Sequence, residues 1–223
     1  MPQNTNLNVS PYFDDFVDSK NYQKVLFKPG FPVQARELTT LQSILQNQVE
    51  KFGQHFFKEG SMIIPGGTTY DDEYFSVKID PNFLNIPVSN YTKILVDQNV
   101  KIKGETSGVE ATVVNRLTSS ESIDGFDTLY VKYTKSGTDG ESTVFLDGEN
   151  LITLSTFNYL NTSITADSQF ARCIVSNATS IGSAFSVSEG VYFIRGYFIK
   201  NVSSTAILDQ YTNSPTYRVG FLL

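Results

Sequence analysis

Residues 33–53 read VQARELTTLQSILQNQVEKFG and hold the longest helical pattern of the chain. Leucine and phenylalanine return there at the three- and four-residue spacing that places side chains along one face of a helix. The residues on this face are Leu38, Leu41, Leu45 and Phe52. We therefore predict a helix from about Val33 to Phe57.

The partner of this face has two interpretations. In a heptad pattern Gln48 takes the d position between Leu45 and Phe52, and a polar layer of this kind fixes register and copy number in a coiled coil. The face is then a seam between three copies of the chain. Alternatively, the helix docks by this face on its own sheet. The residues of the predicted seam are Leu38, Leu41, Leu45, Gln48 and Phe52.

Gly53 is unusual inside this pattern, because glycine costs about 1 kcal/mol relative to alanine in a helix interior. We therefore expect a bend or a close approach of another segment at this position. Lys58 and Gly60 then follow, as is typical of a helix C-terminus.

The chain after the helix is predicted to be β, in short runs rich in Val, Ile, Tyr, Phe and Thr. The runs are SMIIPGG (61–67), EYFSVKI (73–79), KILVD (93–97), NVKIKG (99–104), EATVVNRL (110–117), TLYVKYT (128–134), NLITL (150–154), ARCIVSN (171–177), GVYFIRGYFIKNV (190–202) and YRVGFLL (217–223). The last run has no terminating turn, so we expect the chain to be the N-terminal part of a longer polypeptide.

These patterns predict an α+β fold that is mainly β, with one long helix packed with short-stranded antiparallel sheets. Residues 1–32 lack a helical period and form an extended arm. Residues 33–91 supply the helix and the first β part of a domain, and residues 157–223 supply its second β part. Residues 92–156 hold closely spaced strands and are predicted to form an inserted SH3-like or OB-like barrel.

An internal echo supports the insertion. Residues 59–66 and 189–196 both consist of an acid and a glycine, an apolar strand and a final glycine. We predict that the two segments lie in one sheet. In the second segment large apolar side chains alternate on both faces, as in a central strand or one covered by a partner subunit.

Charge and composition exclude several classes. The formal net charge of −6 argues against a nucleic-acid partner, since such proteins concentrate positive charge. Cys173 is the single cysteine, lies in an apolar stretch and is predicted to be buried. The chain lacks a signal-peptide pattern and an apolar run of membrane-spanning length, so we expect a soluble protein.

Catalytic patterns are absent from the sequence. The only histidine, His55, stands among phenylalanines, and we interpret it as a packed or interface residue. The acidic clusters at residues 14–18 and 71–73 match no calcium loop and are interpreted as solvated acids. We predict no enzyme, cofactor or metal. The alternative is a glycan depolymerase that uses Asp71, Asp72 or Glu73.

Two blocks of the chain resemble an uncharacterised family of virion proteins from tailed phages, prominent among contractile-tailed and cyanobacterial phages. The first block is FKPG (27–30), VQARELT (33–39), LQ (41–42), FG (52–53) and FKEG (57–60). The second block is IRGYF (194–198), LDQY (208–211) and PTYRVG (215–220). The resemblance implies a structural protein of a tail fibre or baseplate.

We therefore expect a virion protein that assembles as a homotrimer and attaches to other tail or baseplate proteins through its arm, which orders on binding. The anchoring aromatics of the arm are Tyr12, Phe13, Phe16, Phe27 and Phe31. The alternative is a receptor module that binds host surface glycan through the inserted barrel, with Tyr130, Tyr133 and Phe145 stacking on sugar.

Overall fold

The computed structural model describes residues 9–160 and 162–221, and the chain divides into two compact units. The first unit consists of residues 1–68 and 187–204, and the second of residues 69–186 and 205–223. The fold is mainly β, with antiparallel sheets, as expected. The predicted boundaries at 92 and 156 both fall inside the second unit.

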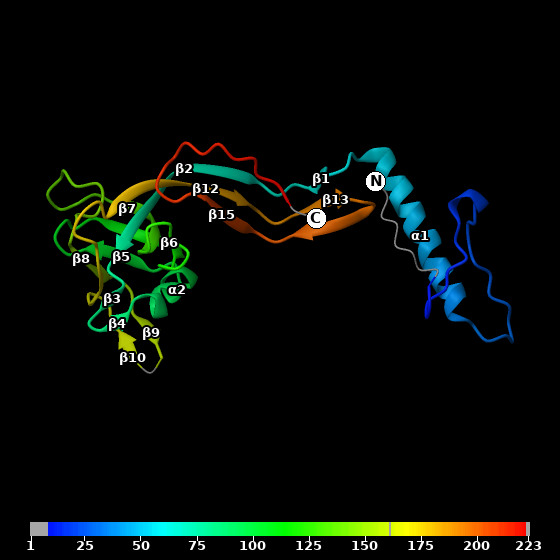
Figure 1. The fold of residues 1–223 in the computed structure, drawn as a ribbon, viewed down its shortest axis with the longest axis horizontal. Helices are drawn as coiled ribbons and strands as arrows, with labels where there is room; N and C mark the ends of the chain where they lie inside the picture. The colour runs from blue at the N-terminus through cyan, green and yellow to red at the C-terminus, as the bar shows by residue number, and fades with distance from the viewer. Residues whose placement is uncertain (1–8, 161, 222–223) are drawn as a thin grey trace. The chain divides into compact units, whose positions relative to one another are not determined.

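The first unit holds helix α1 (Ala35–Phe56), strand β1 (Met62–Ile64) and the hairpin of β13 (Gly190–Ile194) and β14 (Tyr197–Asn201). The arm contains a 3-10 turn, η1 (Asp18–Lys20), and folds back beside α1 (Figure 1). A capping box starts α1, in which the Gln34 N–H donates to the Glu37 carboxylate at 2.9 Å.

The three strands of this unit form one antiparallel sheet in the order β1-β13-β14. Met62 lies opposite Tyr192, so the two segments of the internal echo pair with each other. The prediction that they share a sheet is confirmed. Residues 190–202 are a hairpin and not a single strand, because Arg195 and Gly196 both have positive φ and form its two-residue turn. The predicted alternation of faces through this turn is therefore wrong.

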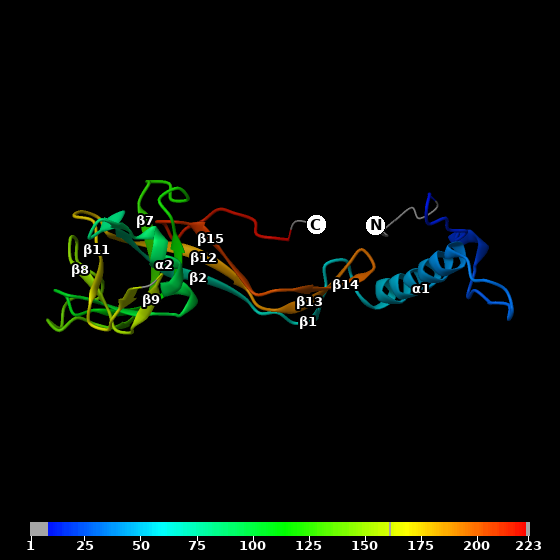
Figure 2. The same ribbon diagram turned by 90° about the horizontal axis from the view of Figure 1, so that it is seen from below.

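The second unit is built on a sheet of eight strands in the order β11-β8-β5-β6-β7-β2-β12-β15 (Figures 1 and 2). The strands are β2 (Thr68–Ile79), β5 (Lys101–Gly104), β6 (Glu110–Leu117), β7 (Asp127–Lys135), β8 (Asn150–Thr153), β11 (Gln169–Arg172), β12 (Thr179–Val187) and β15 (Ser204–Asp209). Within the described residues this order is open, and no closed barrel is found. Two further pairs are β3 (Asn82–Phe83) with β4 (Ile86–Pro87), and β9 (Phe157–Tyr159) with β10 (Thr162–Ile164).

Helix α2 (Ser89–Asp97) contacts β6 and β9 (Figure 1). Its residues 93–97 were expected to form a strand. A short apolar run does not distinguish a strand from a buried helix, and Tyr91 and Leu95, four residues apart, enter the core together. Residues 217–221 form no strand, and residues 222–223 lie outside the described part of the chain. Strands β12 and β15 had no counterpart in the prediction.

Three side chains tie separate segments of the second unit together at the β6–β7 turn. The Lys78 ammonium of β2 lies 2.7 Å from the Asp124 carboxylate, which also accepts from the Tyr211 hydroxyl at 2.8 Å. The Lys78 ammonium lies 4.0 Å from the centre of the Tyr211 ring. Burial acts to raise the pKa of Asp124, but hydrogen bonds from Lys78, Ser122 and Tyr211 outweigh it and lower that pKa to about 2.

This cluster predicts a pH dependence of stability. Because the folded-state pKa of Asp124 lies below its unfolded value, the stabilisation is present above about pH 4 and is lost as the pH falls toward 2. Because Asp124 is exposed, solvent screening reduces this stabilisation to about 1 kcal/mol or less. Urea unfolding at pH 2 to 6 should show this difference between the natural chain and Asp124→Asn. Equal pH profiles for the two proteins would contradict the assignment.

Candidate interaction surface

One face of α1 is occupied by the arm. The Thr39 hydroxyl donates to the carbonyl of Phe13 at 2.6 Å, and the Ser43 hydroxyl donates to the Asp14 carboxylate at 2.5 Å. The N–H of Asp15 donates to the Thr40 hydroxyl at 3.2 Å. Short polar side chains on this face therefore replace the apolar contacts of an ordinary docked helix.

The acidic cluster of the arm serves the same attachment. Asp14 is buried, and Asp15 and Asp18 pair with Arg36 at 3.5 Å and Lys51 at 2.6 Å. The two ion pairs are exposed and contribute little individually. The interpretation of these residues as solvated acids therefore fails for Asp14. The described residues contain no group of three acids, histidines or cysteines suited to a metal.

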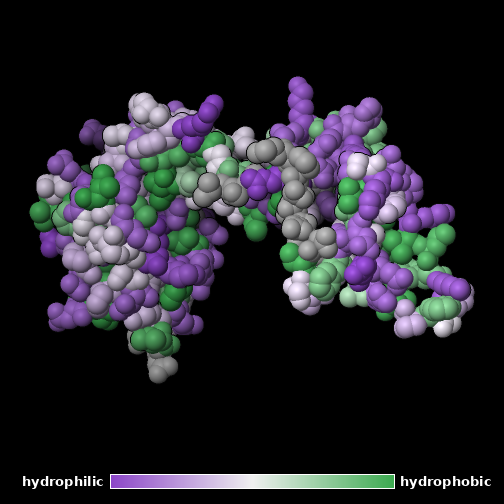
Figure 3. Space-filling model, turned by 45° about the vertical axis from the view of Figure 1, so that its right-hand side comes forward, coloured by the Kyte–Doolittle hydropathy of each residue, from purple (hydrophilic) through white to green (hydrophobic). Residues whose placement is uncertain are grey.

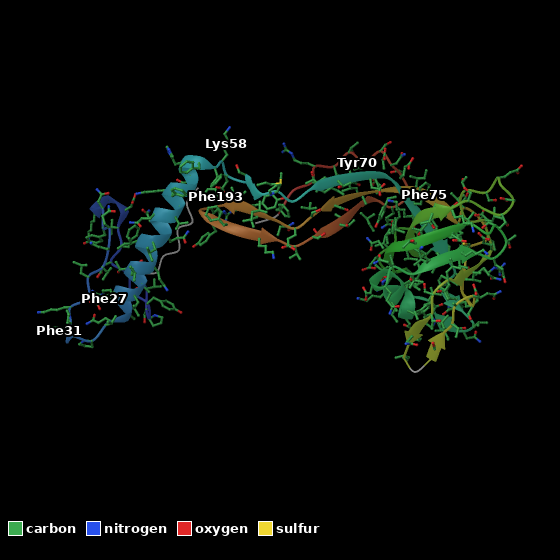
Figure 4. All side chains as sticks on the ribbon, turned by 180° about the vertical axis from the view of Figure 1, so that it is seen from behind. Phe27, Phe31, Lys58, Tyr70, Phe75 and Phe193 are labelled. Atoms are coloured by element: carbon green, nitrogen blue, oxygen red, sulfur yellow. The ribbon has the colours of Figure 1, made fainter. Side chains whose placement is uncertain are left out.

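A second part of the helix is covered by the β13–β14 hairpin. A Cβ atom at Gly53 would lie 2.3 Å from the Phe193 ring, so the predicted close approach is confirmed. Phe57 contacts the rings of Phe193 and Phe198 at centroid distances of 5.9 and 6.1 Å. The Gln46 amide donates to the carbonyl of Gly196 at 3.1 Å, which holds the turn of the hairpin. Phe193 lies near the C-terminal end of α1 (Figure 4).

The remaining face of α1 is apolar and exposed. Leu38, Leu45, Phe52 and Phe56 are 51, 52, 61 and 62% exposed, Val49 is exposed, and Leu41 is half-buried. Hydrophobic side chains reach the surface of the first unit among hydrophilic ones (Figure 3). The structure therefore brings four of the predicted seam residues, Leu38, Leu41, Leu45 and Phe52, onto one apolar stripe, in which Leu41 alone is half-buried. We name the six residues Leu38, Leu41, Leu45, Val49, Phe52 and Phe56 the α1 stripe.

Gln48, the fifth predicted seam residue, lies at the border of this stripe. Its amide donates to the carbonyl of Gln23 in the arm at 3.4 Å. Gln34 caps the helix and Gln54 donates to the Glu50 carboxylate at 2.9 Å. The recurrent glutamines of the helix thus contribute contacts within the chain. The sequence gives no signal for the partners of Gln46 and Gln48, since these lie in distant segments, whereas Gln34 and Gln54 bond within one turn of the helix.

The arm exposes its own apolar residues. Phe27 and Phe31 lie at the outer end of the arm (Figure 4), Tyr12 and Phe13 are exposed, and Phe16 is half-buried. The Lys28 ammonium lies 4.4 Å from the centre of the Phe31 ring. The structure therefore divides the predicted attachment residues into two groups. Tyr12, Phe13 and Phe16 belong to the part bonded to α1, and Phe27 and Phe31 belong to the loop beyond it.

The other candidates are placed less favourably for chemistry. Tyr130 and Phe145 are buried, so these two rings are unable to form an exposed surface for sugar. Tyr133 lines an open pocket of about 390 Å³ with Phe75. Cys173 is buried, as predicted, and burial raises the pKa of its thiol.

The two candidates for acid–base chemistry are both exposed. His55 contacts the ring of Phe56 edge-on at 5.1 Å. Asp71, Asp72 and Glu73 are exposed on β2.

Comparisons with known proteins give one match. The model of a domain of unknown function, DUF4815, matches residues 10–115, which include the arm from residue 10 onward and α1. A search of curated proteins and a search of solved structures gave no match. Neither helix of the described residues is long and apolar enough to cross a membrane.

Proposed function

We propose that this chain is a structural protein of a tailed-phage virion, the N-terminal attachment and oligomerisation module of a tail fibre or baseplate component. In this role it assembles as a homotrimer, and the α1 stripe forms the contact between copies. The observation that carries the proposal is the division of α1 into two faces. The arm and hairpin occupy one face, and the other face leaves large apolar side chains exposed.

Exposed apolar side chains gathered on one surface mark a contact site more strongly than scattered ones. A helix of this length is marginal as an isolated coiled coil. The arm and the hairpin hold α1 in place before the copies meet, which lowers the entropy lost on association. The resemblance to virion proteins supplies the setting, and the stripe supplies the means of assembly.

Leu41→Asp combined with Leu45→Asp is expected to convert the trimer to monomers, because association would bury two unpaired carboxylates per copy. Light scattering across a dilution series measures the mass, which should fall from three chains of 24.8 kDa to one. Asn47→Asp adds one carboxylate per copy outside the α1 stripe and should leave the trimer intact. Circular dichroism verifies that each variant is folded. A natural chain that is monomeric at all concentrations would refute the trimer.

The loop that contains Phe27 and Phe31 is proposed to attach the chain to another tail or baseplate protein. Their rings are exposed, whereas the preceding part of the arm is bonded to α1. Phe27→Ser combined with Phe31→Ser should reduce incorporation into virions about tenfold or more, which corresponds to about 1.4 kcal/mol of lost affinity. Immunoblotting of purified particles measures incorporation. Leu84→Ser, at an exposed leucine of the second unit, is the control. Full incorporation of the double variant would exclude this role.

A further inference from the structure

The α1 stripe repeats with a period of eleven residues. Val49, Phe52 and Phe56 occupy the places of Leu38, Leu41 and Leu45 one period later. Within each period the second residue follows the first by three positions and the third follows the second by four. The next period begins four positions later. A heptad seam would continue from Leu45 to Gln48, whereas the exposed apolar side chains continue from Leu45 to Val49.

Helix geometry shows that Gln48 and Val49 lie at different angles around the helix axis. At 100° per residue the α1 stripe spans about 80° of the helix circumference, and Gln48 lies about 60° from its midline. An eleven-residue repeat corresponds to about 3.67 residues per turn, close to the 3.6 of a straight helix. The stripe therefore follows α1 with little supercoiling, and its slight drift favours a right-handed supercoil. Gln48 is turned toward the arm, to which its amide is bonded.

The charges of α1 indicate which partner fits. Arg36 and Lys51 pair with aspartates of the arm, Glu37 closes the capping box and Glu50 is buried. None of these residues belongs to the stripe, which carries no ionisable side chain. A second copy of this chain, which also carries a net charge of −6, therefore meets the stripe without burying an ion there. The stripe is also self-complementary, since parallel copies in register place equivalent apolar layers side by side.

We infer that the α1 stripes of neighbouring copies pack together in parallel and in register, in a nearly straight bundle with an eleven-residue repeat. Val49 and Phe56 belong to the seam, and Gln48 lies outside it. The inference rests on the proposed trimer, because cyclic threefold symmetry requires the three helices to run parallel. The bundle thus has continuous apolar layers, and no polar glutamine layer sets its register.

Cysteine cross-linking of the complete chain tests this seam. The only natural cysteine, Cys173, is buried, so an introduced cysteine on α1 is the only thiol exposed for cross-linking. Val49→Cys is expected to form a disulfide between copies under mild oxidation at least about ten times faster than Gln48→Cys, because Cβ atoms must approach to about 4 Å. Non-reducing electrophoresis measures the linked fraction. A denatured sample shows the background rate.

Cysteines at the two ends of the α1 stripe distinguish a parallel from an antiparallel arrangement of the helices. Leu38 and Phe56 are about 27 Å apart along the helix. In a parallel bundle, Leu38→Cys and Phe56→Cys each link to themselves. In an antiparallel pair, they link only when the two variants are mixed.

The outcomes distinguish a failure of the eleven-residue seam from a failure of the proposed trimer. A trimer in which Gln48→Cys links faster than Val49→Cys has a heptad seam, which overturns the inference and leaves the proposed function standing. A trimer that links at neither position has its seam elsewhere and also overturns the inference. A monomer by light scattering removes the proposed self-association itself. As a second measurement, Gln48→Leu should leave the concentration at which the trimer dissociates within about twofold of the natural value, and a tenfold stabilisation would favour the heptad seam.

Discussion

Gly66→Ala is expected to destabilise the first unit by about 3 kcal/mol, within the upper range of overpacking changes. A Cβ atom there would lie 2.6 Å from the carbonyl oxygen of Ser188 and 3.0 Å from that of Glu189. Both neighbours are backbone atoms, so no side-chain rotation relieves the contact. The approach is reciprocal, because a Cβ atom at Gly190 would lie 2.7 Å from the nitrogen of Gly66. The two glycines therefore allow the β1 and β13 segments to meet.

The adjacent Gly67 provides a matched control. A Cβ atom at Gly67 would lie 3.6 Å from the Ser188 hydroxyl, an ordinary contact, and this residue is exposed. Gly67→Ala is expected to be neutral or to stabilise by up to about 1 kcal/mol, because alanine lowers the entropy of the unfolded chain. Hydrogen exchange of residues 57–67 and 188–201 reports on this unit separately from the other. Equal protection in the two variants would show that the close approach carries no strain.

Glu149→Ala is expected to destabilise the second unit by about 3 kcal/mol or more. The Glu149 carboxylate is buried and accepts from the N–H groups of Leu146, Ser107 and Thr106 at 2.7, 3.0 and 3.2 Å. It also accepts from the Ser107 hydroxyl at 3.0 Å. Alanine would leave the N–H and hydroxyl groups of Ser107 buried without this acceptor, and each unsatisfied group costs about 1–3 kcal/mol. The β5–β6 turn and the start of β8 would lose the group that joins them.

Glu149→Gln and Glu141→Ala complete this experiment. Glutamine keeps the shape and one acceptor oxygen, but it places an NH₂ group among donors, so we expect an intermediate loss of stability. Glu141 is exposed, and its replacement should change the stability by less than about 0.5 kcal/mol. Guanidinium unfolding followed by far-ultraviolet circular dichroism compares the three variants. If Glu149→Ala unfolds with the natural midpoint, the buried carboxylate is not structural.

Several features could be predicted because their cause is local in the sequence. The turns at Gly108, Gly125 and Gly148 occur at positive φ, a conformation that glycine adopts without steric cost. The anomaly of Gly53 within a helical pattern correctly indicated a close neighbour. The internal echo identified the two segments that pair, β1 and β13, although they are separated by a large insertion.

Other features could not be predicted because their cause lies in distant segments. Residues 93–97 are helical because their apolar side chains join a core assembled from several strands. The hairpin turn at Arg195 and Gly196 lies inside a run that alternation alone extends as one strand. The arm looked unstructured by composition, yet Asp14 is held by Ser43, which lies in another element.

The sequence by itself determined that residues 35–56 form a helix with an apolar face, because helical periodicity is a property of nearby residues. Only the tertiary structure decided which face is used within the chain. Thr39 and Ser43 meet the arm, and Gly53 meets a hairpin residue that follows the whole insertion. These contacts occupy one side of α1 and leave the α1 stripe exposed. Helical periodicity alone would place the apolar face against the rest of the chain, but the long-range contacts are made by the short polar side chains of the opposite face and by Gly53.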